Sequence, residues 1–180
     1  MQTTSLLVEL MVIGLWACSW VYPLASLVVP NAEIKRIVLA NNIGLLIAIA
    51  AIYFIGMFTN LIADISLRWF DSIAANKFGG KQEIQKLRVA VFTKSGDAYQ
   101  YLLQRRSMVR VFRANWISTM LFLIVYIFNV NNTRKSLVAN SIVFSLVLLG
   151  LAALLFYAYA RTLRGYFAFI KQAGEIVKLD

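Results

Sequence analysis

Four apolar runs constrain the fold of this 180-residue chain more than any other feature of its sequence. A helix of about 20 apolar residues covers the roughly 30 Å of hydrocarbon in a bilayer. The runs occupy about residues 5–29, 37–67, 114–130 and 137–160. They predict an all-α integral membrane protein with four transmembrane helices.

The composition shows that these runs cannot all lie inside a soluble domain. Apolar residues make up 61% of the chain and charged residues 14%, whereas soluble globular chains have about 45–50% and about 25%. A chain of this length has too few interior positions to bury so much apolar surface, because its surface is large relative to its volume. The surplus is therefore expected to face lipid.

The connections between the runs predict how the helices pair. Residues 30–36 and 131–136 form short connections, and short connections make neighbouring helices antiparallel hairpins. The chain then divides into four parts. These are hairpin 1 (residues 1–67), a basic helical segment (68–113), hairpin 2 (114–160) and an amphipathic tail (161–180).

The distribution of positive charge predicts the orientation in the membrane. Ten Lys and Arg residues lie between Arg68 and Arg113 and four in the tail, against two in each short connection. With four spans, the termini and the middle segment share one side, and the positive-inside rule places that side in the cytoplasm. We therefore expect an N-in, C-in protein of the bacterial inner (cytoplasmic) membrane.

The cytoplasmic parts read as helices that extend out of the spans. Residues 68–78 are predicted to continue the second span and to stop at Gly79 and Gly80. Residues 81–93 are predicted to form a helix, although the stretch 89–92 also suits a strand. From Ala98, an amphipathic helix is expected to run without a break into the third span. The tail is predicted to be amphipathic and either to lie in the interface or to pack on the middle segment.

Few residues could carry catalysis. The chain has no histidine and one cysteine, Cys18, which excludes His-dependent general base catalysis, an intrachain disulfide and a cysteine metal cage. We find no glycine-rich phosphate loop and no nucleophile–base pair. The sequence therefore predicts a protein that is not an enzyme and holds no cofactor or metal.

Two acids, Glu9 and Asp64, lie within or at the edge of the spans and are the candidate intramembrane site. An ionisable residue there costs several kcal/mol unless it is paired or hydrated. One interpretation makes the two acids a cation site at the inner mouth of a pore. The other makes them structural: Asp64 would pair with Arg68, four residues on, and Glu9 with Arg113 or Arg161. For Asp64 we favour the structural interpretation, and for Glu9 both stay open.

The arginines at the inner ends of the third and fourth spans are the second candidate site. They could hold a nucleic-acid backbone, but no nucleic-acid-binding fold signature accompanies them. We therefore expect them to contact an acidic partner or anionic lipid headgroups. The residues concerned are Arg105, Arg106, Arg110, Arg113, Arg161 and Arg164.

These features predict a non-enzymatic membrane subunit that anchors or docks a cytoplasmic partner in a larger membrane assembly. A comparable layout occurs in membrane subunits of bacterial antiphage-defence and secretion-type complexes, and no residue motif ties the chain to either. The alternative is a homo-oligomeric ion channel gated from the cytoplasmic side. Expected partners are a bilayer with anionic headgroups, further copies of the chain and a soluble protein with an acidic surface. Nucleic acid is not expected.

Overall fold

The computed structural model describes residues 2–25, 42–94, 96–132 and 138–179, and every element in these ranges is a helix. The five helices are α1 (Gln2–Ala25), α3 (Asn42–Asn76), α4 (Lys81–Lys94), α5 (Gly96–Asn132) and α6 (Val138–Leu179). Helices α1, α3, α5 and α6 are long and apolar enough to cross a membrane. The prediction of an all-α chain with four such helices is confirmed. The connections 30–36 and, in large part, 131–136 lie outside the described residues.

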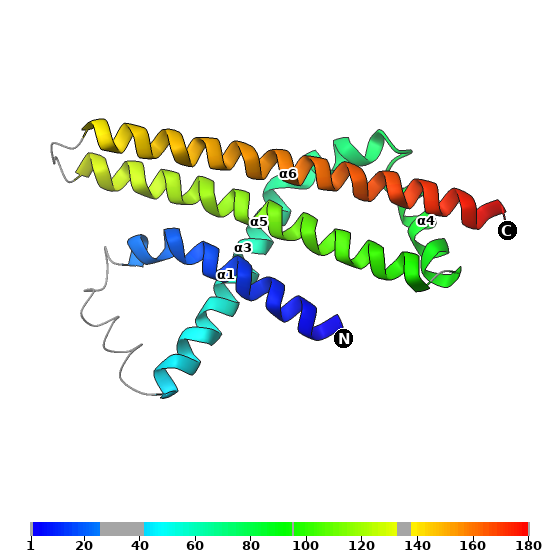
Figure 1. Cartoon of the computed structure of the whole chain (residues 1–180), viewed down its shortest axis with the longest axis horizontal. Helices are drawn as coiled ribbons and strands as arrows, with labels where there is room; N and C mark the ends of the chain where they lie inside the picture. The colour runs from blue at the N-terminus through cyan, green and yellow to red at the C-terminus, as the bar shows by residue number, and fades with distance from the viewer. Residues whose placement is uncertain (1, 26–41, 95, 133–137, 180) are drawn as a thin grey trace.

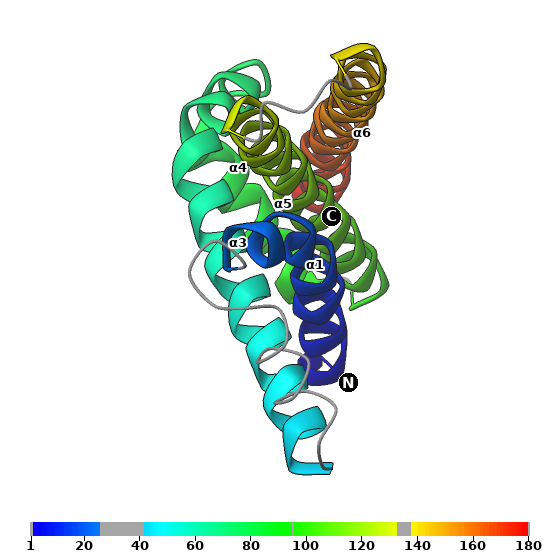
Figure 2. The same ribbon diagram turned by 90° about the vertical axis from the view of Figure 1, so that its left-hand side faces the viewer.

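Helix α5 lies at the centre of the molecule (Figure 1). Helix α6 runs antiparallel beside it along the long axis, while α1 packs on its other side (Figure 1). Helix α3 crosses α1 and α5 obliquely (Figure 2), so the four long helices do not form a parallel-sided bundle. The N-terminus, α4 and the C-terminus lie toward one end of the molecule (Figure 1).

Two glycines allow α1 and α3 to cross closely. A Cβ atom added at Gly14 would overlap the carbonyl oxygen of Ile52, and one added at Gly56 would overlap that of Leu10. Small residues let helix backbones approach in a membrane, where close van der Waals packing replaces the hydrophobic effect as the force between helices. The crossing of α1 and α3 therefore depends on both glycines having no side chain.

The predicted stop after the second span is confirmed. Helix α3 ends at Asn76, and Gly79 and Gly80 follow with φ of 103° and 89°. Positive φ is a region that glycine enters without steric cost. The Gly80 amide donates a 3.1 Å hydrogen bond to the carbonyl of Ala75, which satisfies one of the last carbonyls of the helix. The chain can then turn back into α4.

Helices α5 and α6 are too long for the membrane alone. At 1.5 Å per residue, the 37 residues of α5 and the 42 of α6 extend about 55 and about 63 Å, against a hydrocarbon layer of about 30 Å. The predicted continuity of α5 is confirmed. The tail is not a separate helix but the end of α6, which runs without a break from Val138 to Leu179.

The projecting ends of the helices share a core. Leu87 and Val91 of α4 are buried together with Leu102 of α5 and with Leu163 and Ile170 of α6. A Cβ atom at Gly174 of α6 would lie 2.6 Å from Cδ2 of Leu87, which shows how closely α4 and α6 approach. The tail thus packs on the middle segment, the second of the two arrangements that the sequence left open. We call this unit (residues 68–76 of α3, α4, 96–113 of α5 and 161–179 of α6) the helical platform.

Candidate functional site

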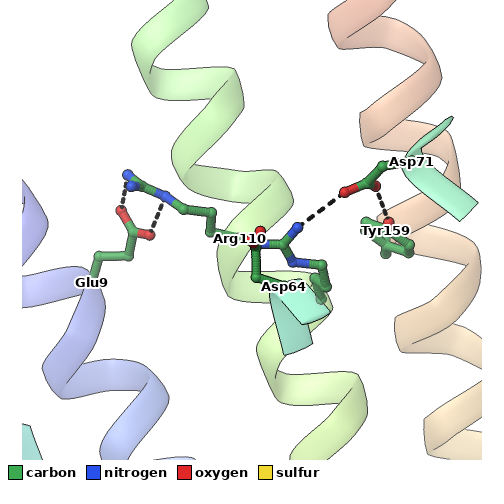
Figure 3. Close-up of polar contacts among 6 residues, drawn as sticks. Glu9, Asp64, Asp71, Arg110 and Tyr159 are labelled. Carbon is green, nitrogen blue, oxygen red and sulfur yellow. Dashed lines mark hydrogen bonds and ion pairs between the residues drawn. The ribbon is translucent and has the colours of Figure 1, made fainter. Parts of the chain in front are cut away.

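A layer of charged and polar side chains joins all four long helices (Figure 3). Each helix contributes at least one member, and the members form ion pairs or hydrogen bonds with one another. We call this set the charged layer. It consists of Glu9 from α1, Asp64 and Asp71 from α3, Arg110 and Arg113 from α5, and Tyr159 from α6.

The first half of the charged layer ties α1 to α5. Glu9 is only 4% exposed. Its Oε1 lies 2.8 Å from Nε of Arg110, and its Oε2 accepts hydrogen bonds from Nη2 of Arg110 at 2.9 Å and from the Ser107 hydroxyl at 2.7 Å. Two contacts to one guanidinium fix the orientation as well as the distance of the two groups. The charge of Glu9 is therefore neutralised inside the protein.

The second half of the charged layer ties α3 to α5 and α6. The Arg113 side chain, 6% exposed, lies between two carboxylates: its Nη2 is 2.8 Å from Oδ1 of Asp64, and its Nη1 donates to Oδ2 of Asp71 at 3.1 Å. The buried Tyr159 hydroxyl donates a hydrogen bond to Oδ1 of Asp71. The Asp64 side chain remains 56% exposed, so one carboxylate of this group is accessible from outside.

The pairing partners differ from those that the sequence indicated. Glu9 pairs with Arg110 and not with Arg113 or Arg161, and Asp64 pairs with Arg113 and not with Arg68. The rule that favours a partner four residues on applies along one helix. In this fold the oblique crossing of α3 and α5 brings a buried guanidinium to Asp64, and a buried cation requires a counter-charge more than an exposed one does.

The predicted arginine site divides into two groups. Arg110 and Arg113 are engaged by carboxylates within the protein. Arg105 donates a 2.8 Å hydrogen bond from Nε to the Tyr101 hydroxyl. Arg106, Arg161 and Arg164 are exposed. For Arg105 and these three, contact with a partner or with lipid headgroups stays a prediction.

Sequence reasoning missed Asp71 and Tyr159 as members of the charged layer, and Ser107 as a hydrogen-bond donor to it. Asp71 follows Asp64 by seven residues, two helical turns, so both lie on nearly the same face of α3; that spacing was a usable signal. Tyr159 lies at the inner end of the fourth span, where tyrosine is commonly an exposed residue of an aromatic belt, but it is fully buried against Asp71. No sequence pattern distinguishes it from Tyr157, two residues earlier.

A cleft of about 670 Å³ opens beside the charged layer, between α3, α5 and α6. Its apolar wall comes from α3 and includes Met57, Phe58 and Leu61. Its basic wall comes from α5. That wall contains Arg106, Arg110 and Arg113, with Asp64 and Asp71 opposite. The cleft is therefore amphipathic: charged side chains from both α3 and α5 line one part of it, and apolar side chains of α3 line another part.

The described residues use the charged side chains of this layer for contacts between helices. Among them, no group of three His, Cys, Asp or Glu side chains comes together in a way that could hold a metal ion. The carboxylates of Glu9, Asp64 and Asp71 are each held by an arginine. Comparisons of the chain with protein-family models, with curated protein sequences and with solved structures gave no match.

Proposed function

We propose that this chain is a non-enzymatic membrane subunit that anchors a cytoplasmic protein partner in a larger membrane assembly. The observation that supports this most is the helical platform. Long helices that cross a membrane need not extend beyond it, yet here α3, α5 and α6 continue past the length of a span and bury a common core with α4. A packed core makes the platform a rigid surface, and rigid elements bind a partner with less loss of entropy than flexible ones.

The charge of the platform supports an acidic partner. Its exposed side chains include several cations spread over α3, α4 and α6. These are Arg68, Lys81, Lys86, Arg164 and Lys171. A complementary acidic surface would be steered toward them, which raises the association rate and the specificity more than the affinity.

The orientation that this function requires is the one the positive-inside rule favours, with platform and termini in the cytoplasm of a bacterium. The single cysteine makes this testable. In a Cys18→Ser background, Gln100→Cys in the exposed first part of α5 should react with a membrane-impermeant maleimide only after the cells are opened. Asn131→Cys should react in intact cells. The reverse labelling pattern would contradict the proposal.

An ion channel built from several copies is the less favoured alternative. What weighs against it is the burial of Glu9 and its contact with Arg110, because a neutralised acid cannot select cations at a pore mouth. If Glu9→Gln changes the ion selectivity of the reconstituted protein, the channel becomes the better account.

The direct test is purification of the tagged chain from its native host in mild detergent, followed by mass determination and identification of everything retained. We expect a stoichiometric soluble protein that is lost from the Lys81→Glu/Lys86→Glu variant. The matched control, Arg134→Glu/Lys135→Glu, reverses two charges in the connection predicted on the opposite side and should retain it. A symmetric oligomer of this chain alone would contradict the docking function. As for the pathway, antiphage defence and secretion are suggested by the layout alone.

A further inference from the structure

The amphipathic cleft between α3, α5 and α6 differs from an ordinary surface groove in its charge. Three arginines and two aspartates line it; Arg113 contacts both aspartates, while Arg110 is paired with Glu9 from outside the cleft. Arg106 forms no ion pair with any of the described residues. The cleft therefore presents one guanidinium that is free to form an ion pair with a bound anion.

Two further cations lie near Arg106. Arg88 of α4 and Arg110 are both close enough to interact electrostatically with Arg106. These like charges repel one another, and a bound anion would relieve the repulsion. Guanidinium groups bind phosphate oxygens with paired, charge-assisted hydrogen bonds. The mouth of the cleft is thus suited to a phosphate group.

The opposite wall of the cleft is suited to hydrocarbon. Met57, Phe58 and Leu61 are 46%, 58% and 54% exposed, and they belong to the apolar stretch of α3 that can cross a membrane. Such large apolar side chains are stable in this position when acyl chains cover them. The exposed apolar surface continues along α3 through Phe54 to Ile47, so an acyl chain that leaves the cleft can follow the helix.

We propose that this cleft binds one anionic phospholipid of the inner leaflet, with its phosphate on Arg106 and its acyl chains against the α3 wall. The volume of about 670 Å³ falls within the roughly 300–1,000 Å³ of small-molecule sites. It holds a headgroup and the upper part of the chains, while the remainder lies in the bilayer. The proposal does not depend on the docking function, because it requires no protein partner.

The test uses the purified full-length chain in mild detergent, with lipid binding followed by native mass spectrometry. Phosphatidylglycerol is titrated against phosphatidylcholine, whose headgroup has no net charge, and soluble glycerol phosphate serves as the third probe. We expect phosphatidylglycerol to bind more tightly than either of the other two. Arg106→Gln should weaken the binding of phosphatidylglycerol on the order of tenfold, which corresponds to the loss of one hydrogen bond between charged groups. Arg106→Lys, which keeps the positive charge, should weaken it less.

The matched control is Arg68→Gln, which removes an exposed arginine of α3 that does not line the cleft. It should leave binding within about twofold, because an exposed charge away from the bound phosphate is largely screened by solvent and salt. Equal losses in the Arg106→Gln and Arg68→Gln variants would overturn the proposal in favour of general surface attraction. Binding of glycerol phosphate as tight as that of the lipid would overturn it in favour of a soluble phosphate ligand.

Discussion

Removing the carboxylate of Glu9 should destabilise the protein through the arginine that it leaves behind. In Glu9→Leu, Arg110 loses both contacts to the carboxylate and the Ser107 hydroxyl loses its acceptor. Breaking a fully buried ion pair costs about 3–5 kcal/mol. The Arg110 side chain is 25% exposed, so water can still hydrate part of the guanidinium. We therefore expect a loss of about 2 kcal/mol in the free energy of unfolding.

The stronger test is the double variant. Replacing both members of a buried pair by apolar side chains of similar size is often neutral or stabilising, so Glu9→Leu/Arg110→Met should regain most of the stability that Glu9→Leu loses. The free energies come from SDS-induced unfolding in mixed micelles followed by circular dichroism. Glu175→Leu, at an exposed position of α6, is the control and should change stability by less than about 0.5 kcal/mol. Additive losses in the double variant would show that the ion pair does not join α1 to α5.

Two further substitutions test the packing and the second half of the charged layer, each with its own control. Gly56→Leu should separate α1 from α3 and lower the free energy of unfolding by at least about 1–3 kcal/mol, as overpacking does. Its control, Gly150→Leu, should be tolerated, because an added Cβ there meets no atom within 4 Å. Equal effects of the two substitutions would refute the close crossing. Tyr159→Phe should cost about 1 kcal/mol through the lost hydrogen bond to Asp71, and Tyr157→Phe, at a side chain 63% exposed, should cost nothing measurable in the same assay.

The sequence predicted the features that are encoded locally. Hydropathy located the four long helices, and the two glycines at 79 and 80 marked the end of α3. The amphipathic pattern from Ala98 onward indicated that α5 continues into the third span. Each of these depends on residues that are neighbours along one helix, so their order in the chain is enough to read them.

The partners across helices could not be read in the same way. Whether Glu9 meets Arg110 or Arg113 depends on the angle and register at which α1 crosses α5, and three residues along a helix amount to less than one turn. The crossing of α1 and α3 rests on Gly14 and Gly56, which are isolated glycines 42 positions apart in sequence and form no motif. Pairing of this kind is a property of the assembled fold.

The central position of α5 has a consequence for how the protein is made. Glu9 leaves the ribosome 101 residues before the arginine that neutralises it, an interval of roughly 5–20 s at about 5–20 residues per second. During that time α1 and α3 carry Glu9, Asp64 and Asp71 into or near the membrane without a counter-charge from α5. The first half of the chain therefore enters the bilayer as an incomplete intermediate, and synthesis of α5 is the step that allows it to mature. A truncated chain that ends before α5 would expose the same unpaired acids to membrane proteases.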